Sequence, residues 1–250
     1  MASWDRPECR TDEIDTLINS VERYNPANTA VLEDYLALQI REDSYDSLAN
    51  LALLKLLQFN PDSVVVPDDP DEPDTIQLVL VKALAHKPFA ADLSLCVSLL
   101  GDRTSTVLSS PDSIQAFEAA STLSNLLRQR NFPQFWDLLR SKEIYAGPFS
   151  PALESLPSFA GLVRKSIAES IADTFKSLDK SRADRWLGFT KEENEKDKGL
   201  ENFAKEIGWM LDSDTIRIPN TEANDPKSTV HSETVDLSRM VRTLAQSIQV

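Results

Sequence analysis

The sequence is poor in the residues on which most catalytic and metal-binding sites depend. It has only two histidines, two cysteines and six glycines in 250 residues. His86 and His231 have no plausible second metal ligand nearby, and neither a phosphate-binding glycine loop nor a Gly-x-Ser-x-Gly motif occurs. We expect His86 to face solvent at the end of a helical run. The sequence predicts a protein that is not an enzyme, holds no cofactor or metal and takes no small-molecule substrate.

Long apolar runs are also missing. No stretch approaches the length of a membrane span, and residues 1–10 lack the apolar core of a signal peptide. Two cysteines are too few for a disulfide framework, and Cys96 sits in an apolar helical run typical of a core. We therefore expect a cytoplasmic protein with reduced cysteines and no membrane contact.

Basic residues are scarce in the first part of the chain. The net charge is −14, and residues 1–161 carry 12 Lys and Arg against 24 Asp and Glu, whereas residues 162–219 carry 11 against 12. An acidic surface repels phosphate groups, so the first part offers no basic face to nucleic acid. The stretch 62–74 is rich in acids and prolines but lacks the glycine and spacing of a calcium-binding loop. It is predicted to be a solvated insert, as is the Ser/Thr-rich stretch 102–112.

Apolar residues concentrate instead in residues 46–61. Between Leu48 and Phe59 only three residues are polar. Asp46 or Ser47 can cap the start of a helix, and the Asn-Pro that follows Phe59 ends it. Because this helix is apolar nearly all round and too short to cross a bilayer, we expect it to be the inner helix of an all-α array.

A short motif recurs along the first part of the chain. Aromatic-Asn-Pro occurs at 24–26 and again 35 residues later at 59–61, with a looser echo at 131–133. A period in the mid-thirties suits helix-pair repeats, in which each pair buries its face against its neighbours. We expect a helical repeat domain over 1–157, ended by the proline-containing stretch 146–157.

The pattern changes after residue 157. A long helix is expected from Ser158 through Leu178, followed by a short helix holding Trp186 and a third helix stopped by Gly208. Alternating apolar and polar residues at 215–218 then predict a hairpin. Three helices followed by a two-stranded wing form a winged helix, predicted over residues 158–219.

The last part of the chain, residues 220–250, is predicted to be a polar linker and a C-terminal helix. An amphipathic helix of this length is marginal alone in water, so it should order only against something else. It can fold back on the winged helix or dock on a partner, and both alternatives remain open. The apolar stripe that is the candidate partner-binding site consists of Leu237, Met240, Val241, Leu244 and Ile248.

Several motifs together resemble one known family. The segment from Arg23-Tyr24-Asn25-Pro26 through the helix ending at Pro61 closely resembles subunit k of eukaryotic translation initiation factor three. Further matching motifs are Phe135-Trp136, Asp184-Arg185-Trp186-Leu187 and Gly208-Trp209. The likeness spans nearly the whole chain and is weakest across 62–74, 102–112 and 220–232.

The resemblance implies the fold and the role. The fold would be a HEAT-like helical repeat domain followed by a winged-helix domain of the PCI type, all-α with a small β wing. The role would be a non-catalytic structural subunit of initiation factor three, acting in translation initiation. The implied partners are other subunits, notably subunit l, and the small ribosomal subunit through the complex.

Two alternatives remain. A winged-helix nucleic-acid-binding protein would need basic residues on its recognition helix, but residues 199–208 offer Lys205 against Glu201 and Glu206. Direct RNA contact is therefore expected to be weak or absent, and the match at 23–61 disfavours the other alternative, a PCI subunit of the proteasome lid or signalosome. The candidate residues for a weak RNA contact are Arg182, Arg185, Lys196 and Lys198.

Overall fold

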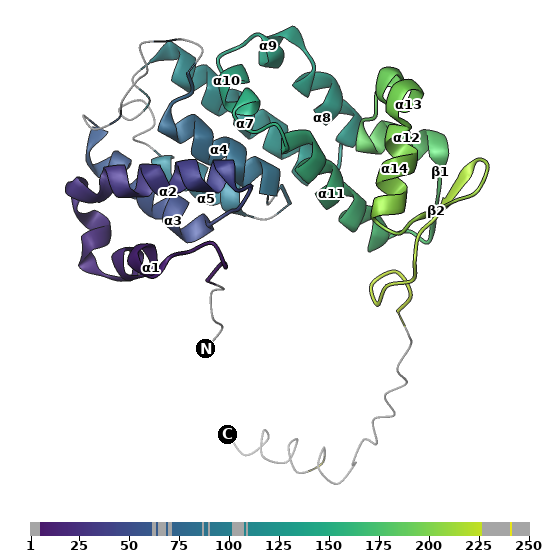
Figure 1. The fold of residues 1–250 in the computed structure, drawn as a ribbon, viewed down its shortest axis with the longest axis horizontal. Helices are drawn as coiled ribbons and strands as arrows, with labels where there is room; N and C mark the ends of the chain where they lie inside the picture. Colours follow the sequence, from purple (N-terminus) through teal and green to yellow (C-terminus); the bar gives the residue numbers. More distant parts are fainter. Residues whose placement is uncertain are drawn as a thin grey trace.

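The structure of the chain is a computed structural model. It describes residues 6–61, 64, 69, 72–86, 88–89, 91–101, 108, 110–226 and 241, except for the side chains of Tyr145, Lys196 and Asp197. Helices dominate this part of the chain, and its sheet has three short strands (Figure 1). Within the described residues, no helix is long and apolar enough to cross a membrane.

The first part of the chain is an array of stacked helices. Chain neighbours pack as the pairs α2–α3, α4–α5 and α7–α8, and successive pairs contact each other through α3–α5 and α4–α7. This stacking is that of a helical repeat and confirms the expected fold class. The elements are α1 (Asp12–Asn19), η1 (Val21–Tyr24), η2 (Pro26–Asn28), α2 (Thr29–Arg41), α3 (Ser47–Phe59), α4 (Thr75–His86), α5 (Asp92–Leu100), α7 (Pro111–Arg128), α8 (Phe132–Leu139), α9 (Lys142–Tyr145) and α10 (Ser150–Glu154).

Side-chain caps fix where several of these helices begin. The side chains of Thr11, Asn25, Asp46 and Ser110 each accept a backbone N–H from the first turn of the element that follows. The cap at Asp46 was expected from the sequence, and all four satisfy N–H groups that have no partner within the helix.

The most central helix is α4 rather than α3. Nine of the 12 residues of α4 are buried, against seven of 13 in α3. α4 packs against α2, α3, α5, α7, α10 and α11. The prediction that α3 is the inner helix is therefore only half right, because Leu48 and Phe59 keep 37% and 50% of their surface exposed. The central position of α4 is not evident from the sequence, because the polar residues Gln77 and Lys82 interrupt its apolar residues. Both of these side chains are nevertheless buried.

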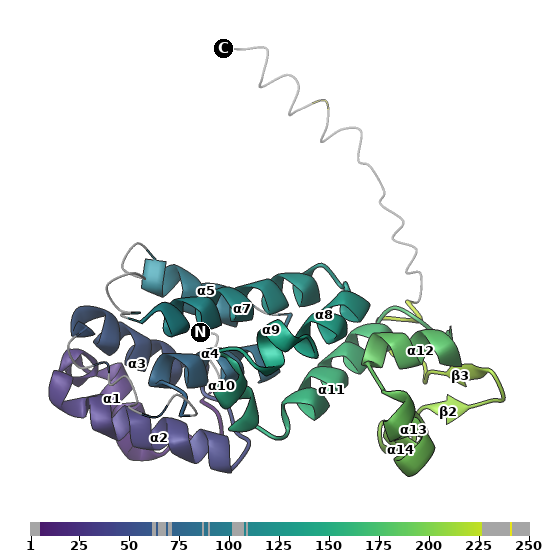
Figure 2. The same cartoon turned by 90° about the horizontal axis from the view of Figure 1, so that it is seen from above.

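Helix α11 leads from the array to a winged helix at the other end of the molecule (Figure 2). It packs on α4 at one side and on α12 at the other. The sheet has the antiparallel order β1-β3-β2, with Leu178 opposite Ile216 and Met210 opposite Arg217. The elements are α11 (Phe159–Ala172), β1 (Ser177–Asp179), α12 (Lys180–Leu187), α13 (Lys191–Asp197), α14 (Gly199–Glu206), β2 (Met210–Leu211) and β3 (Thr215–Arg217).

Three sequence expectations for this part need correction. The long helix ends at Ala172, and Leu178 belongs to strand β1. A three-residue strand is too short to show a period of two, so it could not be predicted from the pattern of residues. Ser158 does not cap α11, because its Oγ donates to Asp43 instead. The sequence predicts three helices here, whereas the structure has a fourth, α13. All seven of its residues are polar or charged, and a capping box, not an apolar face, fixes its start.

Buried apolar side chains form one continuous cluster from Ile14 to Ile218. The domain boundary expected at residue 157 stays a prediction. Beyond β3, Asn224 donates to the carbonyl of Ala172 and so ties residues 219–226 to the end of α11.

Candidate functional site

The winged helix is joined to the helical array around one indole ring. Trp136 of α8 is buried, and its Nε1 donates to the carbonyl of Trp186 in α12 at 2.9 Å. Gly188 follows α12 with φ +65° and lies directly against the same ring. A Cβ at this position would overlap the indole, and the left-handed backbone also disfavours other residues. The close approach of α8 to the end of α12 therefore requires glycine.

Two arginines hold the same turn. Arg164 of α11 donates through Nε to the carbonyl of Leu187 at 3.0 Å and through Nη2 to that of Gly188 at 3.1 Å. Arg140 also donates to the carbonyl of Gly188. Both guanidinium groups also lie near the Trp136 ring, at 5.6 Å for Arg140 and 5.5 Å for Arg164. Positive charge at the C-terminal end of α12 complements the helix dipole, so these contacts lock the joint in place.

A carboxylate completes the arrangement. Glu193 accepts from Arg164 at 2.9 Å and from the backbone N–H of Thr190, the N-cap of α13, at 2.7 Å. Burial opposes the charged form, but the Thr190 N–H and Arg164 outweigh it and hold the pKa of Glu193 below its usual value. Arg164 thus connects α11, α12 and α13, and the turn cannot shift without breaking several charge-assisted bonds.

A second polar cluster lies inside the helical array. Arg10 forms a bidentate ion pair with Asp46, in which both N–O distances are 2.7 Å. Both side chains are almost wholly buried. This pairing raises the pKa of Arg10. The Tyr35 hydroxyl donates to the Asp46 carboxylate. The side-chain oxygen of Gln39 accepts from the backbone N–H of Asp46 and from the Asn50 amide, and its amide nitrogen donates to the Asn50 oxygen. The cluster fixes the segment before α1, α2 and the start of α3 relative to each other.

A buried amine lies beside this cluster. Lys82 of α4 is fully buried, and its Nζ bonds the carbonyl of Gln39 at 3.1 Å and His86 Nε2 at 3.0 Å. Burial lowers the pKa of Lys82 to about 8, with the charge of Asp43 opposing the shift. His86 stacks on Tyr45 with centroids 5.4 Å apart, and its side chain is only 13% exposed. The expectation that His86 faces solvent is therefore wrong.

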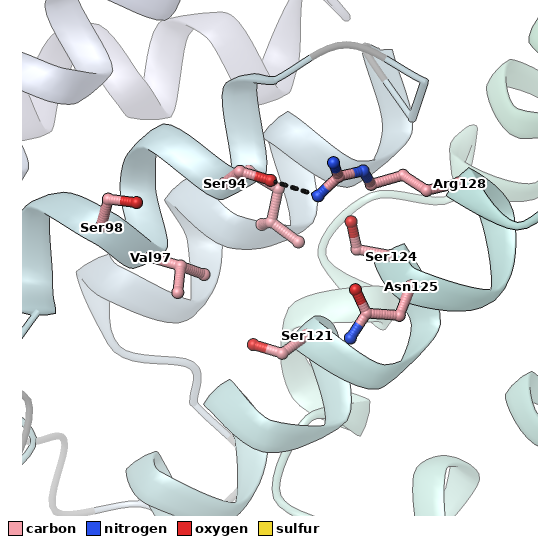
Figure 3. A pocket seen from close by; sticks show the side chains of 8 residues that line it. Ser94, Val97, Ser98, Ser121, Ser124, Asn125 and Arg128 are labelled. Carbon is pink, nitrogen blue, oxygen red and sulfur yellow. Dashed lines mark hydrogen bonds between the residues drawn. The ribbon is translucent and has the colours of Figure 1, made fainter.

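One open hollow lies between α5 and α7 (Figure 3). Its volume of about 210 Å³ is below the roughly 300–1,000 Å³ of ordinary ligand pockets. Arg128 bridges the two helices by donating to Ser94 at 2.8 Å. The other lining residues, Leu93, Val97, Ser98, Ser121, Ser124 and Asn125, include no carboxylate, imidazole or thiol that could act as an acid or base. Among the described residues, no three His, Cys, Asp or Glu side chains are grouped to hold a metal.

The residues proposed for RNA contact come from different elements. Arg182 and Arg185 lie on α12 and are exposed, but Arg182 is 3.9 Å from Asp179 and 5.9 Å from the Trp186 ring centre. Lys196 is on α13, with its side chain outside the described residues. Lys198 is exposed, and it precedes α14 in the left-handed conformation.

The predicted C-terminal site falls almost entirely outside the described residues. Of its five members, Leu237, Met240, Leu244 and Ile248 are not described. Val241 is described as helical, with 64% of its surface exposed.

Sequence reasoning missed the joint as a site, although it singled out some of its residues. Phe135-Trp136 and the segment 184–187 were noted as family motifs, and the structure brings them together across 50 residues. Nothing in the sequence pointed to Arg140 or Arg164, because an arginine at a helix surface gives no sign of which carbonyl it binds.

Comparison with known proteins agrees with this fold. A mostly helical chain that ends in a small winged helix is the PCI type. Residues 70–229 match the model of the CSN8/PSMD8/EIF3K family. The chain belongs to that family.

Individual relatives narrow the similarity to one group of proteins within this family. Three fungal proteins named eukaryotic translation initiation factor 3 subunit K align over nearly the whole chain. The protein of Botryotinia fuckeliana is 33% identical over 98% of this chain and 95% of its own length. The protein of Sclerotinia sclerotiorum is 32% identical over 96% and 95%, and that of Aspergillus terreus is 31% identical over 99% and 98%. The resemblance to subunit k seen in the sequence is confirmed.

Proposed function

We propose that this chain is a non-catalytic structural subunit of the eukaryotic translation initiation factor 3 complex and works in the cytoplasm. The observation that carries the proposal is the near-full-length similarity to proteins named as subunit K of that factor. The geometry supports a scaffold role, because the largest polar clusters of the described residues bind backbone groups and other buried side chains. At the joint, Trp136, Arg140 and Arg164 all bind carbonyls at the end of α12.

The chain acts through protein–protein contacts, with subunit l as a direct partner and the small ribosomal subunit reached through the complex. Direct RNA contact is weak or absent, because the chain is acidic and α14 carries Glu201 and Glu206 against Lys205. Lys180 also forms an ion pair with Glu201 of α14 at 3.2 Å, so its positive charge is already balanced by a carboxylate of the recognition helix. Any residual RNA contact runs through Arg182, Arg185, Lys196 and Lys198.

The C-terminal stripe, Leu237 to Ile248, is proposed to dock on other subunits. Because Asn224 is tied to α11, the test is truncation after Pro226 rather than at the end of the winged helix. If the tail docks, the truncated protein keeps the melting temperature of the full chain but co-purifies with less of the complex. A melting temperature lowered by many degrees with intact association would instead make the tail part of the core.

Affinity purification of the tagged full chain from cells tests the proposal as a whole. We expect subunits of initiation factor 3 to co-purify, with subunit l retained at the highest salt. Recovery of proteasome-lid or signalosome subunits instead would overturn it. Tight binding of the isolated protein to small-subunit RNA, lost on Arg182→Glu with Arg185→Glu, would favour the nucleic-acid alternative.

A further inference from the structure

An apolar stripe on α3 is left exposed by the residues that the structure describes. α3 has apolar residues nearly all round, as expected of a helix with neighbours on every side. Leu48, Lys55 and Phe59 fall at i, i+7 and i+11, which places them on one face. Leu48 and Phe59 are exposed, and Lys55 between them is half-buried. At 1.5 Å per residue the stripe is about 16 Å long, or three helical turns.

The 3₁₀ helix η1 extends this stripe. Val21 and Tyr24 are three residues apart and so share one side of a 3₁₀ helix, with 80% and 53% of their surfaces exposed. The Tyr24 ring meets Phe59 edge to face, with centroids 6.4 Å apart. Four of the eight exposed large apolar side chains among the described residues therefore belong to η1 and α3. Such a concentration marks a contact surface, because aromatic side chains supply much apolar area there.

Two cations frame the stripe. The Arg23 guanidinium lies 5.4 Å from the centre of the Tyr24 ring, and Lys55 Nζ lies 4.6 Å from that of Phe59. No carboxylate of the described residues forms an ion pair with either cation. This is unusual in a region where acids outnumber bases by 24 to 12. Lys55 Nζ does donate to Gln58 Oε1 at 2.7 Å, but that amide carries no charge. Two positive charges without a carboxylate partner in the described part of the chain, beside an aromatic surface, complement a partner whose apolar residues are flanked by carboxylates.

We propose that the α3 face, defined as Val21, Tyr24, Leu48 and Phe59 with the cations Arg23 and Lys55, binds an acidic amphipathic helix of another protein. Its apolar side covers the aromatic pair, and its Asp or Glu residues pair with the two cations. A second copy of this chain fits less well. A two-fold contact of the face with itself would set the same cations against each other.

The proposal rests on the proposed function only in that the partner is sought first within initiation factor 3. The test places the photo-reactive residue p-benzoylphenylalanine at position 59 of the tagged full chain in living cells, followed by irradiation and denaturing purification. The same substitution at Met210, exposed on β2, is the control for position. Mass spectrometry of the cross-linked peptides identifies the partner and the segment.

We expect position 59 to cross-link to one protein, in a segment with apolar residues at helical spacing flanked by Asp or Glu. Arg23→Glu with Lys55→Glu should lower the yield about tenfold, whereas Lys165→Glu, which reverses an exposed charge on α11, should not. An unchanged melting temperature of the double variant shows that the fold is intact.

The outcomes separate the two proposals. An acidic amphipathic segment in a protein outside initiation factor 3 supports the docking face and counts against the proposed function. Cross-links to a second copy, to RNA or to a segment without carboxylates overturn the docking face, and so does the absence of any cross-link from position 59.

Discussion

The buried amine of Lys82 should make the protein less stable at neutral pH than the same chain with an apolar side chain there. Folding takes this group from an ordinary pKa of 10.5 to about 8, because burial disfavours the ammonium. At pH 7 the folded protein must keep the charge buried, at a cost of about 3 kcal/mol. Between pH 8 and 10.5 the unfolded state binds more protons than the folded state, so this cost is lost as the pH rises.

Lys82→Met tests the argument. The variant loses two hydrogen bonds, but the carbonyl of Gln39 still accepts the backbone N–H of Ser44. The lost bonds should cost about 1 kcal/mol, less than the relief of the buried charge. We therefore expect the variant to be more stable than the wild type at pH 7 by roughly 1–2 kcal/mol. This advantage should shrink by about 2 kcal/mol between pH 7 and pH 10.

The assay is urea unfolding followed by far-ultraviolet circular dichroism at several pH values. The difference between the two proteins is the quantity to compare, because other groups titrate in the same range. Burial raises the pKa of Cys96 to about 12, which lowers stability as the pH rises, but this contribution is common to both proteins. Lys165→Met, on the exposed surface of α11, should show no pH-dependent difference. A difference that stays constant with pH for Lys82→Met would refute the reasoning.

Three further substitutions test the fold and the joint. Gly188→Ala should lower the free energy of unfolding by about 2–4 kcal/mol through backbone strain and overlap with the indole. Gly208→Ala, also at positive φ but with open space around it, should cost only about 1 kcal/mol, and equal losses would contradict the packing account. Leu54→Asp buries an unpaired carboxylate and should cost about 4 kcal/mol, far more than Leu48→Asp, in thermal melts. Asp46→Ala removes the bidentate partner of the buried Arg10 and leaves its guanidinium only Asp15, at 3.1 Å. It should cost about 3 kcal/mol, so a melt like that of wild type would show that the network is dispensable.

Local sequence signals predicted what local physics determines. Asp46, one of the two caps expected from the sequence, caps α3, because a cap depends on residues within one turn. The hairpin of β2 and β3 followed from alternation beside a polar turn. α13 escaped prediction since its seven residues carry no apolar face, and the short strand β1 has only Leu178 pointing inward.

The long-range contacts could not be predicted. Trp136 was recognised as part of a motif, but its role depends on a carbonyl 50 residues away and on a glycine with positive φ. The burial of Lys82 could not be predicted, because sequence periodicity records which residues are apolar and not how long polar side chains are accommodated. Its burial depends on the end of α2, where the carbonyl of Gln39 accepts a hydrogen bond from its Nζ.

The contacts at the Gly188 turn connect two parts of the molecule that lie far apart. The α3 face is at one end of the molecule and the winged helix at the other (Figure 1). A partner on the proposed α3 face would keep a fixed position relative to the winged helix only if the chain between them keeps its shape. Arg164 and the indole of Trp136 provide that rigidity, because any rotation about the turn at Gly188 breaks bonds to several buried carbonyls at once. A flexible linker would permit both contacts and specify no angle between them. Two arginines and a buried indole gathered at one turn therefore suit the proposed scaffold role.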